Sequence, residues 1–153
     1  MYPALRRLAV LPLGLAVLTA CEIPPRFVQT TAEVDAFVLQ KRYRSACVGL
    51  QANDETVREH AAKTLEDLPH VQVVNDCLCA ALYDAEKHTT DTPVARGLAG
   101  SERDDLASCL APALEDSAIT GEDRARVVAD LGGMEAASAY AAIEGLLGDP
   151  DPA

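Results

Sequence analysis

A 32-residue repeat of cysteines and leucines constrains this chain more than any other feature of its sequence. Repeats of this length are typical of folds in which neighbouring units stack and bury a shared core. Shifting the chain by 32 residues superposes four pairs of identical residues: Cys47 and Cys79, Cys77 and Cys109, Leu50 and Leu82, and Leu78 and Leu110.

The apolar residues recur at helical spacing, and no credible strand is predicted, so we expect an all-α protein. Thr30-Thr31-Ala32-Glu33 is a capping box that opens a helix towards Leu50. Asp91-Thr92-Pro93 starts a short helix that ends at about Gly100. The other predicted helices run from Asn53-Asp54 to Pro69, from Val71 to Leu82, from a Ser101 cap to about Leu114, from a Thr120 cap to Gly132-Gly133, and from about Met134 to Leu147.

Residues 54–65 (DETVREHAAKTL) resemble the first helix of a HEAT-like repeat. Residues 148–151 (GDPD) resemble the loop that separates one such repeat from the next. The resemblance covers roughly residues 54–150 and implies a short right-handed α-solenoid of about three HEAT-like helix pairs. The middle unit departs from the pattern, because Gly97 and Gly100 interrupt its first helix. An irregular helical bundle is the alternative.

The first 21 residues have the layout of a bacterial export signal. Two arginines precede an uncharged apolar run from Leu8 to Leu18, which is shorter than the roughly 20 residues needed to span a bilayer. The tetrad Leu18-Thr19-Ala20-Cys21 resembles the lipobox of bacterial lipoproteins. The resemblance implies cleavage before Cys21 and acylation of its sulfur. A soluble secreted protein with an accidental cysteine at this position is the alternative.

The sequence therefore predicts three segments: a signal peptide (1–20), a lipid-anchored tether (21–29) and a HEAT-like helical repeat domain (30–150). Acyl chains contribute about 0.8 kcal/mol per buried CH₂, so two or three of them anchor a protein stably in a membrane. Glu22 follows the cysteine, and by resemblance to known sorting signals this residue favours the outer membrane over the inner membrane. The predicted location is the cell envelope.

All 24 acidic residues but only 11 of the 13 basic residues follow residue 20, which leaves a mature net charge near −13. A surface this acidic argues against nucleic acid as a partner.

The four remaining cysteines predict two disulfides, since thiols oxidise outside the cytoplasm. Three pairings are possible. In a stack of helix pairs, the second helices of successive repeats lie side by side. Cys77 and Cys79 are about 200° apart around a helix axis, so they face opposite neighbours. The pairing that respects the repeat is Cys47 with Cys77 and Cys79 with Cys109.

Several groups of polar residues could have either a chemical or a purely structural role. The four cysteines with His60, His70 and His88 could hold zinc, but no zinc-ribbon or thioredoxin-like spacing is present, and no metal or cofactor is predicted. Three acidic pairs could act as general acids and bases or bind calcium, although helix caps favoured by the helix dipole account for them better. A basic cluster near the tether could face lipid headgroups or an acidic partner, or be a solvated helix face. The acidic pairs are Asp104-Asp105, Glu115-Asp116 and Glu122-Asp123, and the basic cluster is Lys41, Arg42 and Arg44.

No catalytic motif was found, and no catalytic residue is predicted. The sequence favours a lipid-anchored envelope protein that acts as an interaction or scaffolding module for an unidentified envelope protein. The alternatives are an enzyme or lyase-related HEAT-like protein, which only fold analogy supports, and a purely structural lipoprotein.

Overall fold

The computed structural model describes residues 27–147, and almost all of their regular structure is helical. The predicted signal peptide, Cys21 and residues 148–150 lie outside the described residues. The elements are α1 (Thr31–Leu39), α2 (Tyr43–Cys47), the 3₁₀ turn η1 (Val48–Gln51), α3 (Glu55–Glu66), α4 (Gln72–Leu82), β1 (Tyr83–Asp84), β2 (Thr89–Thr90), α5 (Thr92–Gly97), α6 (Asp104–Leu110), the 3₁₀ turn η2 (Ala111–Leu114), α7 (Gly121–Gly133) and α8 (Ala137–Leu147).

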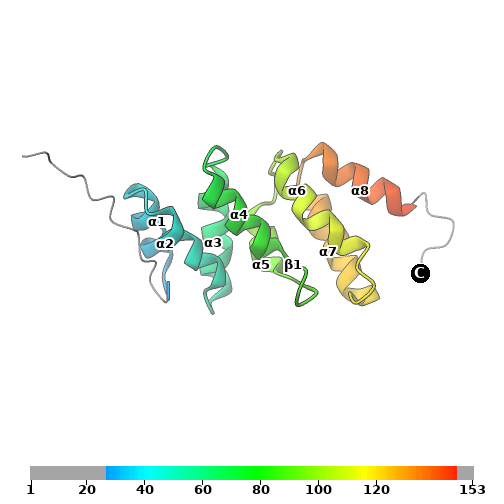
Figure 1. Cartoon of the computed structure of the whole chain (residues 1–153), viewed down its shortest axis with the longest axis horizontal. Coiled ribbons are helices and arrows are strands. Elements are labelled where there is room, and N and C mark those ends of the chain that lie inside the picture. Colours follow the sequence, from blue (N-terminus) through cyan, green and yellow to red (C-terminus); the bar gives the residue numbers. More distant parts are fainter. Residues whose placement is uncertain (1–26, 148–153) are drawn as a thin grey trace, which may run out of the picture.

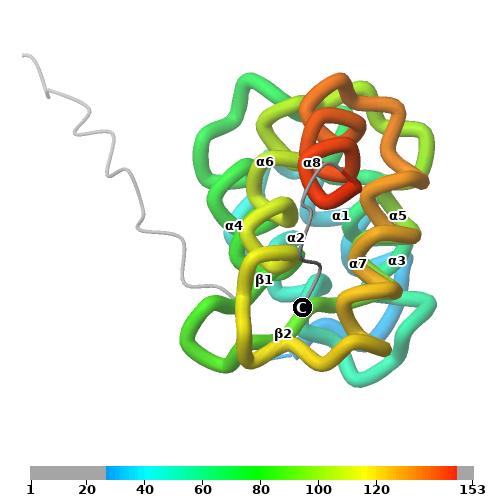
Figure 2. The backbone as a smooth tube through the Cα atoms, turned by 90° about the vertical axis from the view of Figure 1, so that its right-hand side faces the viewer, coloured from blue at the N-terminus to red at the C-terminus, as the bar shows by residue number. Residues whose placement is uncertain are grey.

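The helices follow one another along the long axis of the molecule and form two rows (Figure 1). In one row α1 contacts α3, α3 contacts α5, and α5 contacts α7. In the other row α2 contacts α4, α4 contacts α6, and α6 contacts α8. An end-on view places α4 and α6 on one side and α3, α5 and α7 on the other (Figure 2).

The core runs between the two rows as one continuous cluster of buried side chains. Its largest members are mostly leucines and valines, and on α3, α4, α6 and α7 the buried residues recur every three or four positions, which keeps them on one helix face. Leu50, Leu82, Leu78 and Leu110, the leucines superposed by the 32-residue shift, are all buried. The sequence repeat is therefore a repeat of core positions. Val28 is also buried, so the core begins within the stretch predicted as tether.

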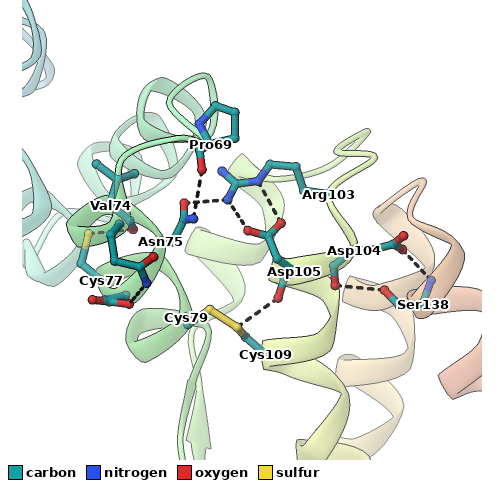
Figure 3. Close-up of a disulfide and its surroundings, with 12 residues drawn as sticks. Pro69, Val74, Asn75, Cys77, Cys79, Arg103, Asp104, Asp105, Cys109 and Ser138 are labelled. Carbon is teal, nitrogen blue, oxygen red and sulfur yellow. Dashed lines mark hydrogen bonds and ion pairs between the residues drawn. A yellow bond between two sulfur atoms is a disulfide. The ribbon is translucent and has the colours of Figure 1, made fainter.

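Two disulfides connect three successive helices of the second row. Cys47 on α2 bonds to Cys77 on α4, with 6.0 Å between their Cα atoms. Cys79 on α4 bonds to Cys109 on α6, with 5.2 Å between their Cα atoms (Figure 3). These are the two pairs that the 32-residue repeat predicts. Helix α4 is therefore bonded covalently to both of its neighbours.

A polar network next to the second disulfide makes a further connection (Figure 3). Arg103 is largely buried and donates hydrogen bonds to the Glu66 carbonyl at 3.1 Å and to Asn75 Oδ1 at 2.7 Å. It also pairs with Asp105. One side chain thus joins the start of α6 to the end of α3 and to α4.

The single helix predicted from Thr30 towards Leu50 is wrong, because the chain turns sharply between α1 and α2. The Lys41 amide donates to the Val38 carbonyl and the Arg42 amide donates to the Phe37 carbonyl, at 2.9 and 2.8 Å. This is the Schellman pattern, whose left-handed position is usually occupied by glycine. Lys41 occupies it here, with φ of 57°. The Arg42 guanidinium lies 4.9 Å from the centre of the Phe37 ring and closes the turn.

The prediction of no strand is also wrong, although only locally. The connection between α4 and α5 is an antiparallel hairpin in which Tyr83 pairs with Thr90 and Asp84 with Thr89. Two residues per strand are too few to give the alternating pattern by which strands are recognised.

Two helices begin a few residues later in the chain than the sequence predicts. Helix α6 begins at Asp104, and Ser101 is buried before it, where its hydroxyl accepts a hydrogen bond from the Arg103 amide at 3.3 Å. Helix α8 begins at Ala137, and Met134 is a buried residue of the preceding turn.

Gly97 is where α5 packs most closely against α3. A Cβ atom at this position would lie 2.3 Å from the Glu59 carbonyl oxygen and 2.8 Å from the Ala62 Cβ. No real side chain fits that space unless the helices separate. The glycine that interrupts the middle unit in the sequence is therefore what lets these two helices pack closely.

We expect Gly97→Ala to lower the free energy of unfolding by about 1–3 kcal/mol or more, as overpacking does in cores. The matched control is Gly132→Ala on α7, because a Cβ there meets no atom within 4 Å. That variant should be neutral or stabilising by up to about 1 kcal/mol, from helix propensity. Urea unfolding followed by circular dichroism measures both. Equal effects of the two variants would contradict the packing argument.

The disulfides give a second prediction. Trypsin should leave Cys47 in residues 45–58, Cys77 and Cys79 together in 64–87, and Cys109 in 104–124. Without reductant these three peptides should migrate as one species. In a Cys109→Ser variant, alkylation should modify Cys79 and leave Cys77 protected. Modification of Cys77 instead would contradict the pairing. Each bridge closes a loop with a sequence separation of 30 and should add about 3–4 kcal/mol to stability in the chain-entropy model.

Candidate binding groove

An open groove of about 720 Å³ lies between the first helix pair (α1 and α2), the second helix pair (α3 and α4) and the β1–β2 hairpin. Its lining comes from α2, η1, the start of α3, the C-terminal half of α4, and the segment from Asp84 to Asp91. The connection between α4 and α5 is longer than those before α3 and α7. In helical repeat proteins such extended connections gather on one face, which is often the binding face.

The floor of the groove combines a disulfide with small side chains. Both Cys47 and Cys77 line it, next to Ala80 and Ala81 of α4. Alanines leave space above α4, and the disulfide fixes the separation of α2 and α4. The shape of the groove therefore depends on a covalent bond.

The hairpin forms one wall of the groove. Asp84 Oδ1 accepts hydrogen bonds from the amides of Glu86 and Lys87, each at 3.1 Å, and Oδ2 pairs with the Lys87 ammonium at 2.5 Å. The Lys87 side chain is the main cause of the lowered pKa of Asp84, and Asp84 in turn raises the pKa of Lys87. Both groups are therefore charged at neutral pH.

Arg58 and Asp91 connect the loop before α3 to the start of α5 at another part of the groove lining. Arg58 Nη1 donates to the carbonyls of Ala52 and Asn53, at 2.7 and 3.2 Å, and its Nε lies 2.9 Å from Asp91 Oδ2. The other Asp91 oxygen accepts from the Val94 amide at 3.0 Å and caps α5. Arg58 is therefore occupied with structural contacts.

Arg44 differs from the other cations of the groove. It lies on α2, it is exposed, and it has no hydrogen-bond or ion-pair partner among residues 27–147. A guanidinium in that state is available to an anionic ligand.

Both carboxylates of the groove are already ion-paired, with Lys87 and Arg58, so neither is suited to act as a general base. The arrangement supports binding.

A cluster of three polar side chains fastens the hairpin to the loop before α7. Tyr83 donates a hydrogen bond to Asp116 Oδ2 at 2.6 Å, and His88 Nδ1 lies 2.6 Å from the same oxygen. Asp116 Oδ1 accepts from the Ala118 amide at 2.9 Å. These contacts, led by the Tyr83 hydrogen bond, lower the pKa of Asp116 to about 2. His88 has φ of 53°, a conformation uncommon outside glycine.

The structure separates the residues that were considered as metal ligands. All four cysteines are in disulfides. His60 lies on α3 and contacts Asp35 Oδ1 at 2.7 Å, His70 lies in the turn before α4, and His88 lies in the hairpin loop. Within residues 27–147, no three histidine, cysteine, aspartate or glutamate side chains are grouped so that they could hold a metal ion.

The acidic pairs have structural partners. Asp104 Oδ1 accepts from the Ser138 amide at 2.8 Å and connects α6 to α8 (Figure 3). Asp123 accepts from the Thr120 hydroxyl at 2.8 Å at the start of α7. Asp105 and Asp116 make the contacts described above, and Glu115 is exposed beside Asp116.

The basic cluster does not act as one surface. Lys41 lies in the α1–α2 turn, Arg42 lies over Phe37, and Arg44 lines the groove. Their closeness in the sequence therefore does not predict a shared role.

Sequence reasoning missed the groove, since its lining comes from elements that are far apart in the chain. The polar stretch between Asp84 and Thr90 was the available signal, because it lengthens one connection of the repeat.

Asp130 on α7 was missed as well. Burial raises its pKa to about 6, and its Oδ2 is buried without a hydrogen-bond partner. Asp130 does not line the groove.

No family model matches the chain, and no curated protein or solved structure is significantly similar to it. Among residues 27–147, no helix has the length and apolar character needed to cross a membrane.

The Asp116 contacts predict how stability depends on pH. A carboxylate whose folded-state pKa is about 2, below its ordinary 3.8, stabilises the folded state above pH 4. That contribution is lost as the pH falls from about 4 towards 2. In Asp116→Asn it should be absent throughout, so the stability difference from the wild type should be constant above pH 4 and shrink below it. Unfolding curves between pH 2 and 7 measure this.

The control for this prediction is Glu115→Gln, which removes the neighbouring exposed carboxylate. We expect its pH profile to follow that of the wild type. An Asp116→Asn profile that also follows the wild type would contradict the role assigned to Asp116.

Proposed function

We propose that this chain is an exported lipoprotein of the bacterial cell envelope, anchored through Cys21, whose helical stack is a binding or scaffolding module for another envelope protein. The observation that carries the proposal is the pair of disulfides that joins α2, α4 and α6. The two-row order of helices further supports a right-handed HEAT-like solenoid as the architecture.

The disulfides support export because such bonds persist in oxidising compartments and are rare in the cytosol, where thiols are kept reduced. Oxidised cysteines at four repeat-related positions agree with the lipobox-like tetrad at Leu18-Thr19-Ala20-Cys21. Two independent parts of the sequence thus point to the same compartment.

The groove supports binding as the activity. Open surfaces between stacked helix pairs are the usual binding sites of helical repeat proteins. This groove is held by a disulfide on its floor and by the Asp116 contacts behind its hairpin wall, so it requires little rearrangement to accept a ligand. A lipid anchor would raise the effective concentration of a membrane-bound partner.

The anchor is tested by labelling cells with an alkyne analogue of palmitate. The wild type should incorporate the label and fractionate with the outer membrane, and Cys21→Ala should do neither. Cys47→Ser is the matched control, because it removes a cysteine that the proposal does not acylate. Retention of label by Cys21→Ala would contradict the proposal.

Binding is tested by placing a photo-crosslinking amino acid at one position of the full chain in cells. Ala80 is exposed on the groove floor, and Ala125 is exposed on α7, outside the groove lining. We expect a discrete adduct with one envelope protein from Ala80 and none from Ala125. No adduct from Ala80, or the same adducts from both positions, would contradict a binding role for the groove.

A further inference from the structure

We propose that the groove binds an extended peptide segment that bears carboxylates, contributed by the partner protein, and that Arg44 is its main anion-binding residue. This inference rests on the proposed function, because it names the chemistry of the partner at the same groove.

The groove carries the opposite balance of charge from the rest of the chain. The full sequence has a net charge of −11. The groove is lined by three cations and only two carboxylates. An excess of positive charge in one groove of an acidic protein marks the place where an anionic group is attracted instead of repelled. The cations are Arg44, Arg58 and Lys87, and the carboxylates are Asp84 and Asp91.

The three cations differ in what they can offer a ligand. Arg58 is 17% exposed, its Nη1 donates to two carbonyls, and its Nε is ion-paired with Asp91. Lys87 is 75% exposed and pairs with Asp84, so its ammonium has further donors to give. Arg44 has no partner among residues 27–147, and its guanidinium can bind a carboxylate through two parallel hydrogen bonds. Two available cations therefore lie on two different walls, α2 and the hairpin.

The shape of the groove favours an extended chain. Its lining includes a disulfide and two alanines, which are small side chains, and no aromatic residue that could stack on a bound ring. Polar side chains along the rim can hydrogen-bond to the backbone of a bound strand: Gln51, Asn53, Thr89 and Thr90. An extended peptide presents such backbone groups along its length, and its acidic side chains can reach the two cations.

A short acidic segment also fits the electrostatics better than a large polyanion does. The mature chain is near −13 overall, so most of its surface outside the groove would repel a large polyanion such as nucleic acid or an anionic membrane. At physiological salt, charges more than about 8 Å away are largely screened, and a few carboxylates in the groove respond mainly to Arg44 and Lys87.

The test uses the full chain, extracted from membranes in a non-ionic detergent, and a fluorescein-labelled nonapeptide of alternating aspartate and serine. The same peptide with asparagine for aspartate is the neutral probe. Fluorescence anisotropy should detect binding of the acidic peptide, weakened as salt is raised, and at least about tenfold weaker binding of the neutral peptide, as expected for loss of a charge-assisted hydrogen bond.

Single substitutions then identify the side chains that bind the acidic peptide. Arg44→Ala should weaken binding of the acidic peptide by about tenfold or more, and Arg44→Lys should fall between it and the wild type, because lysine keeps the charge but not the two parallel hydrogen bonds. Lys87→Ala should weaken binding less. The control is Arg126→Ala, which removes a partly exposed arginine on α7 outside the groove lining and should leave binding unchanged. Thermal unfolding of Arg44→Ala should match the wild type, since the side chain has no hydrogen-bond or ion-pair partner among residues 27–147.

Three results would overturn the inference: equal binding of the two peptides, unchanged binding by Arg44→Ala, or displacement of the bound acidic peptide by phosphatidylglycerol vesicles, which would assign the cations to lipid. The crosslinking experiment at Ala80 distinguishes failure of this inference from failure of the proposed binding function. A crosslinked envelope protein at Ala80 without binding of the acidic peptide leaves the binding role in place and rejects the acidic ligand. No adduct and no peptide binding reject both.

Discussion

The rest of the structure depends on the placement of Cys77 and Cys79, two cysteines on α4 that are separated by a single residue. Because Cys77 and Cys79 point to opposite sides of the helix, a single helix is bonded to α2 and to α6. A thin stack of short helices has little interior relative to its surface. Covalent bonds between neighbours supply part of the stability that a small core lacks. They also keep the spacing of the second row constant, which noncovalent packing of alanine-rich helices would do less strictly.

The groove is a consequence of that constraint together with one exception to the repeat. The first disulfide sets its floor, and the hairpin between α4 and α5 supplies a wall that the shorter connections do not build. The hairpin is too short to be stable alone. Asp116, from the loop before α7, fastens it through Tyr83 and His88. The groove between the first two helix pairs is thus shaped in part by a residue of the loop before α7.

The sequence predicted those features that the repeat period controls. The period related Leu50 to Leu82 and Leu78 to Leu110, all of which are core residues, and it led to the two cysteine pairs seen in the structure. Features that depend on single residues in unusual conformations were missed. The α1–α2 turn has Lys41 where glycine is the usual signal, and the hairpin strands are too short for alternation. The groove was missed because it depends on contacts between distant segments, which a pattern of spacing does not contain.

The burial of Val28 has a consequence for where the groove can operate. Only seven peptide units separate Cys21 from this fixed core residue, and a fully extended chain of that length spans at most roughly 25 Å. If Cys21 is acylated, Val28, which precedes α1, is held within that distance of the lipid headgroups. The groove is also lined by Val28's neighbours in space, η1 and the loop before α3, so such an anchor would keep the groove close to the membrane. Under that condition a partner would have to bring its binding segment close to the membrane surface, and a segment held far from the membrane would not reach the groove.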